Sequence, residues 1–254
     1  MNRLVISILI FILSAYPIIS QSKPTDILLG SVKTVTESTY SVEVLFGEVN
    51  RGMIKSKVII YYDDRGNNTI RDTFVEGGLV SRWSYIYSVE NIRIEGNAYT
   101  EDGSLVMKQI YYYDENKKRT MLRYYDSFGK LMHYYTYTYY ENGKLKEWTT
   151  YNNNNQIINK QKYEYRVDGA VIEEITNPEG RTNNWIYVND ERGRRIQESL
   201  IELSSGGVIE EYKYKYEDDD NGNWIRMIKY RGVYMFERTE YIPYEIVERV
   251  IEYI

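Results

Sequence analysis

Residues 134–145 read Tyr-Tyr-Thr-Tyr-Thr-Tyr-Tyr-Glu-Asn-Gly-Lys-Leu, and this stretch decides the fold class. Tyr135, Tyr137 and Tyr139 alternate with threonines, which is the two-residue period of a half-buried antiparallel strand. The Asn142-Gly143 dipeptide that follows is typical of a turn, because glycine accepts positive φ and asparagine bonds its own backbone. An amphipathic helix would need apolar spacings of three and four, which the stretch lacks.

The same arrangement recurs along the chain, with polar turn clusters mostly about 12–14 residues apart. Most clusters contain glycine, and Glu90-Asn91, Asn116-Lys117 and residues 152–155 replace it with other turn formers. Connections of about four residues are too short for crossover helices, so neighbouring strands must pair antiparallel. We therefore expect an all-β meander of about fourteen strands. A flat sheet of that width would twist, so it is expected to curl into a half-pipe, a spiral or a barrel-like sheet.

The turn sequences resemble the Rhs/YD-repeat family over roughly residues 58–231. The resemblance rests on a tyrosine–acid pair, a glycine and a basic-Leu step, found at Tyr62-Asp63, Tyr113-Asp114, Tyr125-Asp126 with Gly129-Lys130-Leu131, and Tyr140-Glu141 with Gly143-Lys144-Leu145. It implies a spiralling β-sheet in a secreted bacterial repeat protein. The chain has 254 residues and is far shorter than the Rhs shells that enclose a toxin, so no encapsulating role is implied.

The N-terminus has the layout of a secretory signal peptide. Arg3 precedes an uncharged apolar run, 4–13, and small residues follow at Ala15 and Ser20. The run is about half the length that a membrane-spanning helix needs. We predict a signal peptide over residues 1–20, cleaved after Ser20 or after Ala15, with an uncleaved anchor as the alternative.

This layout predicts an exported protein, either periplasmic or extracellular. The segment 21–57 is expected to form a cap strand and loop before the repeats at 58–231. The segment 232–254 is expected to supply closing strands.

The composition excludes several classes of site. The chain has 29 tyrosines, one histidine and no cysteine, so disulfides, thiolate metal sites and a cysteine-linked lipid anchor are ruled out. A formal net charge of −5 disfavours a nucleic-acid partner. We predict no cofactor, no metal and no lipoprotein anchor.

Candidate catalytic residues are few. His133 lies in the most aromatic strand, without the Gly-x-Ser-x-Gly pattern of a nucleophile elbow, and is predicted to sit among tyrosines rather than act as a base. Acidic runs at 63–64, 173–174 and 218–220 could supply the carboxylate pair of a glycosidase, but no pair stands out. Residues 217–222 resemble the start of a calcium loop, but Ile228 stands where a bidentate glutamate is required, so we predict a solvated turn.

We therefore predict a non-catalytic structural or binding module that presents a tyrosine-rich sheet face to a glycan or a protein. The predicted binding residues are Tyr125, Tyr135, Tyr137, Tyr139 and Trp148. The competing interpretation is that these rings only pack against one another.

Two other functions stay open, a small outer-membrane β-barrel and a carboxylate-dependent enzyme acting on glycans. The barrel needs an apolar outward band. Here the apolar face is mostly tyrosine, the mean hydropathy is −0.56, and Glu248 and Glu252 alternate with Val250 on one face of the last strand. We therefore expect no stable membrane insertion after signal cleavage.

Overall fold

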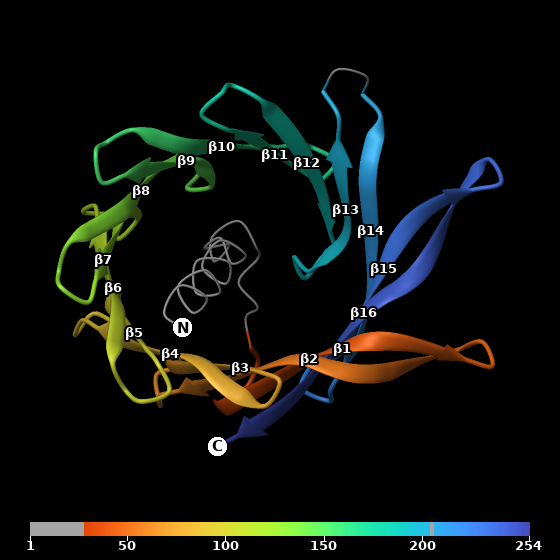
Figure 1. The fold of residues 1–254 in the computed structure, drawn as a ribbon, viewed down its shortest axis with the longest axis horizontal. Coiled ribbons are helices and arrows are strands. Elements are labelled where there is room, and N and C mark those ends of the chain that lie inside the picture. The colour runs from red at the N-terminus through yellow and green to blue at the C-terminus, as the bar shows by residue number, and fades with distance from the viewer. Residues whose placement is uncertain (1–27, 204–205) are drawn as a thin grey trace, which may run out of the picture.

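The computed structural model describes residues 28–203 and 206–254, so the predicted signal peptide at 1–20 lies outside the described residues. The described chain forms a closed barrel, seen end-on in Figure 1. Its described part contains no helix that is long and apolar enough to cross a bilayer. The strands are β1 (Val32–Leu45), β2 (Glu48–Tyr62), β3 (Asn68–Val75), β4 (Gly78–Tyr87), β5 (Arg93–Tyr99), β6 (Leu105–Tyr113), β7 (Arg119–Asp126), β8 (Leu131–Tyr139), β9 (Leu145–Asn152), β10 (Ile157–Tyr165), β11 (Val171–Thr176), β12 (Thr182–Asn189), β13 (Arg195–Ile201), β14 (Val208–Asp218), β15 (Trp224–Met235) and β16 (Arg238–Tyr253).

Every strand pairs antiparallel with its neighbour in sequence, and β16 returns to pair with β1. The all-β antiparallel meander and the barrel-like option are therefore confirmed, whereas the half-pipe, the spiral and the number of about fourteen strands are wrong. The barrel has sixteen described strands, because residues within the segment expected as a cap form β1 and most of β2 in the wall. Closure pairs the backbone groups that an open sheet would leave exposed at its two edges.

The turns explain why acidic residues follow tyrosines at the strand ends. The Asp114 carboxylate accepts backbone N–H groups of Asn116 at 2.9 Å and Lys118 at 2.8 Å, which closes a tight turn. Equivalent bonds are made by the side chains of Asp63, Asp126, Asn152, Asp190 and Asp219.

The turns predicted without glycine adopt the same backbone. Asn91, Lys117 and Asn155 take φ of 64°, 61° and 62°, the conformation that glycine supplies in the other turns.

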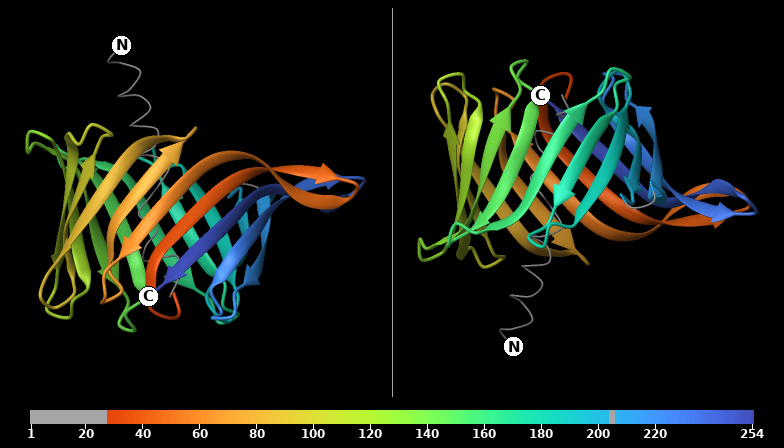
Figure 2. Two further views of the ribbon diagram at one scale, coloured as in Figure 1. Left: turned by 90° about the horizontal axis from the view of Figure 1, so that it is seen from below. Right: turned by 90° about the horizontal axis from the view of Figure 1, so that it is seen from above.

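Two long hairpins extend beyond the barrel as arms (Figure 2). The β1–β16 pairing ends at Tyr40 and Ile246, and beyond it β1 pairs only with β2, and β16 only with β15. The arms are joined where they leave the wall by an ion pair of 2.8 Å between Arg51 and Glu248. Ile246 is fully buried at this junction.

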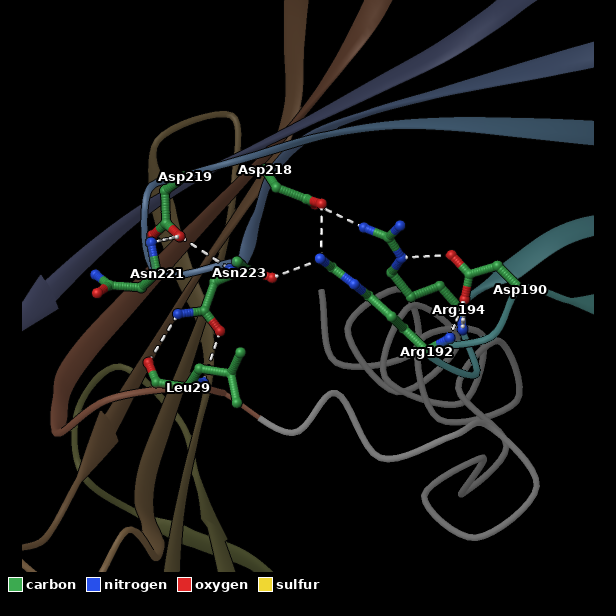
Figure 3. Close-up of polar contacts among 9 residues, drawn as sticks. Leu29, Asp190, Arg192, Arg194, Asp218, Asp219, Asn221 and Asn223 are labelled. Atoms are coloured by element: carbon green, nitrogen blue, oxygen red, sulfur yellow. Dashed lines mark hydrogen bonds and ion pairs between the residues drawn. The ribbon is translucent and has the colours of Figure 1, made fainter.

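A side-chain clamp ties the start of the described chain to the barrel (Figure 3). Leu29 N–H donates to the Asn223 side-chain oxygen at 2.7 Å, and the Asn223 amide donates to the Leu29 carbonyl at 2.8 Å. The same amide donates to the Tyr253 hydroxyl, which in turn donates to Asp219. One turn between β14 and β15 therefore fixes both ends of the barrel sheet.

Candidate functional site on the inner wall of the barrel

Successive side chains of each strand point to opposite faces, and the two faces differ in burial. A buried cluster on one face comprises Ala98, Met107, Leu122, Tyr124, Tyr137, Leu145, Trp148 and Tyr163. A contact that spans one strand identifies this face as the concave one. Lys229 of β15 reaches Glu198 of β13 at 3.0 Å across β14. We call this face the inner wall.

The inner wall holds most of the predicted binding residues. The ring of Trp148 stacks on Tyr137 with centroids 6.4 Å apart and lies 5.1 Å from Tyr135. The Tyr139 hydroxyl donates a hydrogen bond to the backbone carbonyl of Arg119. Tyr125 is not part of this group, because it pairs with Lys108 on the opposite face.

The buried rings of Tyr137 and Trp148 are packing residues, at 7% and 5% exposure. Tyr135 and Tyr139 are only half-buried and pack against the cluster. The inner wall therefore combines packed rings with rings that keep part of their surface accessible.

A buried carboxylate sits beside these rings and was not singled out by the sequence. Glu173 is 8% exposed, and its carboxylate accepts hydrogen bonds from the hydroxyl of Tyr163 at 2.5 Å and from the hydroxyl of Tyr187. The Tyr163 oxygen also accepts the Trp148 indole N–H at 3.0 Å. Burial and the adjacent carboxylate raise the pKa of Tyr187 well above its usual value. This network fixes the orientation of the rings.

A second buried carboxylate is held by cations. Glu198 contacts Arg195 and Lys229, each at 3.0 Å, and accepts the Tyr214 hydroxyl at 2.5 Å. Burial raises the pKa of Glu198, but Lys229, Tyr214 and Arg195 outweigh it, so the net shift is downward. The negative charge of Glu198 is therefore balanced by the positive charges of Arg195 and Lys229.

Two arginines lie on the aromatic side of the inner wall. Arg93 lies 4.0 Å from the Tyr85 ring centroid, and Arg119 lies 5.4 Å and 5.1 Å from the rings of Tyr111 and Tyr137. Sequence reasoning missed both. Each is the first residue of its strand directly after a turn, and they are 26 positions apart, so a search for repeats of that length would have found them.

His133 stacks on Tyr124 with ring centroids 4.3 Å apart. Burial lowers its pKa to about 4, so the imidazole is neutral at physiological pH. It therefore sits among tyrosines, as the sequence predicted.

The acidic runs are separated by the fold. Glu173 faces the inner wall, while Glu174 lies 3.4 Å from Lys162 on the other face. Asp63 and Asp219 close turns, and Asp218 pairs with Arg192 and Arg194 (Figure 3). Within residues 28–203 and 206–254, no cluster of three potential metal ligands is found.

Comparisons with known proteins concern the fold. No protein-family profile matches the chain, and no curated protein matches it in sequence. A crystal structure of a porin-like protein from Bacteroides uniformis superposes with a TM-score of 0.61 at 10% identity, covering 89% of this chain and 99% of that chain. A porin-like protein from Bacteroides vulgatus aligns with a TM-score of 0.26 at 10% identity over 88% of this chain and 99% of the other. The Photorhabdus luminescens Tc holotoxin pore gives a TM-score of 0.29 at 12% identity, over 76% of this chain and 14% of that chain.

The first of these similarities shows a shared barrel fold. This closed barrel is the fold that the outer-membrane β-barrel alternative requires, and it differs from a half-pipe or spiral sheet. The Rhs/YD-repeat resemblance stays a prediction, because no protein-family profile matches the chain.

Proposed function

We propose that the protein is an exported, non-catalytic β-barrel of the cell envelope that binds a glycan on its inner wall. The observation that carries this proposal is the aromatic cluster on the concave face, with the buried carboxylates of Glu173 and Glu198 and the guanidinium groups of Arg93 and Arg119 on the same face. Sixteen-stranded barrels are wide enough to enclose an aqueous channel, so a chain of sugars can enter from an end. Sugar rings present apolar faces that stack on tyrosine and tryptophan, and their hydroxyls bond polar neighbours.

The outer wall has the chemistry of a surface in contact with water. Ion pairs cross it between adjacent strands, at Asp72–Arg82 (2.7 Å), Glu95–Lys108 (2.8 Å), Glu147–Lys160 (3.1 Å) and Lys162–Glu174 (3.4 Å). A lysine or arginine facing lipid at mid-membrane costs about 2–4 kcal/mol in a barrel. Several of these residues lie near the middle of their strands, so a lipid-facing wall would incur that cost repeatedly.

The strand lengths agree with this interpretation. A barrel strand needs about 9–11 residues to cross a bilayer. β5 and β13 have 7 residues each and β11 has 6. We therefore propose a barrel surrounded by water inside the envelope or outside the cell.

The second candidate is an outer-membrane barrel, favoured by the closed topology and the fold shared with the porin-like protein from Bacteroides uniformis. Fractionation of a Gram-negative host separates the two. A water-surrounded barrel leaves the membrane fraction in carbonate without detergent, whereas an inserted barrel stays until detergent is added.

A glycan array probed with the mature chain tests the binding proposal. We expect retention of a subset of glycans, and weaker retention by Tyr135→Ala. Tyr134→Ala is the matched control, because Tyr134 directly precedes Tyr135 on the same strand and stacks on Tyr151 on the outer wall, with ring centroids 4.8 Å apart. An array without any retained glycan would contradict the proposal.

A further inference from the structure

We propose that the inner wall carries an anion site centred on Arg93 and Arg119, which selects a glycan bearing carboxylate groups. This inference rests on the proposed glycan function and adds the chemical class of the ligand. The site comprises the two arginines with Tyr85, Tyr87, Tyr111 and Tyr137, and we call it the arginine–tyrosine patch.

The fold places the two guanidinium groups on either side of one strand. Arg93 begins β5 and Arg119 begins β7, and both strands run in the same direction, so the two residues lie at the same end of the barrel. Tyr111 of β6 lies between them. Its ring is 5.4 Å from the Arg119 guanidinium, and the same tyrosine helps to raise the pKa of Arg93 against the effect of burial. Two positive charges therefore flank one tyrosine.

The groups that contact the Arg93 guanidinium are uncharged. Its Nε and one terminal nitrogen donate to the Tyr87 hydroxyl at 3.0 Å and 2.7 Å. Burial raises the pKa of Tyr85 to about 12, so this ring too is uncharged at physiological pH. Among the ion pairs of the described residues, none joins Arg93 to a carboxylate.

Three other cations of the inner wall have carboxylate partners. Arg195 and Lys229 share Glu198, and Arg249 lies 3.4 Å from Glu37. A buried cation without a counter-ion is costly, and aromatic faces offset only part of that cost. Arg93 has no such carboxylate partner among the described residues. A negatively charged group of a bound ligand would therefore be stabilised more strongly beside Arg93 than beside those three cations.

A second observation points to a ligand at the same place. Tyr137 is 7% exposed, and its hydroxyl has no hydrogen-bond partner among the described residues. The Arg119 guanidinium lies 5.1 Å from the ring of Tyr137. Buried hydroxyl groups are normally paired, so this hydroxyl is an unused donor and acceptor on the same face as Arg119.

The chemistry of the patch favours a carboxylate on a sugar ring. The planar fork of a guanidinium matches the two oxygens of a carboxylate, and the tyrosine rings offer faces on which a sugar stacks. An acidic saccharide provides both groups in one molecule. A neutral saccharide would use the rings and leave Arg93 without an anion.

Calorimetric titration of the mature chain tests the inference with a hexasaccharide of galacturonic acid and its carboxyl-reduced, neutral counterpart. We expect the acidic sugar to bind at least about tenfold more tightly than the neutral one, since charge-assisted bonds are about twice as strong as neutral ones. Arg93→Gln should abolish this preference. Arg123→Gln is the matched control, because Arg123 lies four residues after Arg119 on the other face of β7.

Tyr137→Phe provides a second variant in case Arg93→Gln does not fold. It removes only the unpaired hydroxyl, so it should melt at or above the wild-type temperature and still bind the acidic sugar several-fold more weakly. Equal affinity of the wild type for both sugars, unchanged by Arg93→Gln, would overturn the anion site and leave the proposed glycan function standing. Failure of the wild type to bind either sugar, together with a blank glycan array, would overturn both.

Discussion

The hydroxyl of Tyr113 donates a hydrogen bond of 2.7 Å to the backbone carbonyl of Arg93, 20 residues earlier in the chain. Tyr139 and Arg119 repeat this relationship at 2.8 Å, and Tyr87 bonds the carbonyl of Asn68. Each tyrosine ends an even-numbered strand, and each acceptor begins the preceding odd-numbered strand. The structural repeat is therefore a hairpin of two strands, about 26 residues long, rather than one strand and one turn.

Removing one of these tyrosine hydroxyls at the strand ends should lower the free energy of unfolding. Tyr113→Phe leaves the Arg93 carbonyl without its donor and should cost about 0.5–1.5 kcal/mol. Urea unfolding measures the free energy directly. Tyr234→Phe is the control, since Tyr234 is 74% exposed on an arm and should change the free energy by less than about 0.5 kcal/mol. Equal effects of the two variants would show that the bond from the Tyr113 hydroxyl to the Arg93 carbonyl contributes nothing to stability.

Two variants of Tyr137 distinguish a packing role of its ring from a binding role of its hydroxyl. Tyr137→Ala removes a ring that is 7% exposed and should cost about 3–5 kcal/mol, seen as a lower melting temperature. Tyr137→Phe keeps the ring and removes a hydroxyl without a described partner, so it should melt at or above the wild-type temperature. A wild-type melting temperature for Tyr137→Ala would show that this ring does not hold the wall together.

His133 should make stability depend on pH. Burial lowers its pKa to about 4 in the folded state, against 6.5 for the ordinary group, so the unfolded chain binds the proton more readily. The stability from a neutral imidazole is complete above about pH 6.5 and is lost as the pH falls through about 4, with a loss of at most about 3 kcal/mol. Thermal melts across this range should show a steeper decline for the wild type than for His133→Gln.

The same residue allows a direct check, because the chain has one histidine and NMR would report a single imidazole. A titration midpoint near 6.5 in the folded protein would contradict the buried stacking position on Tyr124.

The clamp at Asn223 should hold the first strand in the barrel. Asn223→Ala removes both bonds to the Leu29 backbone, and we expect a loss of about 1–3 kcal/mol together with faster amide exchange near the start of β1. Asn221→Ala lies in the same exposed turn (Figure 3) and is the control, since only the Asn221 backbone N–H bonds Asp219 there. Unchanged exchange in Asn223→Ala would show that the strand pairing alone closes the barrel.

The sequence by itself determined the local structure. The alternation at Tyr135, Tyr137 and Tyr139 requires a strand, and glycine occupies most of the turn positions with positive φ, which a residue such as Asn91 takes over elsewhere. These are properties of a few neighbouring residues, so they can be read without knowing what lies across the sheet. The position of His133 among tyrosines followed from the same alternation.

Closure and the chemistry of the inner wall were decided only by the tertiary structure. Val35 and Ile251 pair across the seam although they stand near opposite ends of the chain, and the segment before the repeats lacks the repeat pattern that would have predicted a wall strand. Alternation also does not say which of two faces is concave. Tyr125 and Tyr124 are neighbours in sequence, yet the curvature of the closed sheet buries Tyr124 with the arginine–tyrosine patch and places Tyr125 outside.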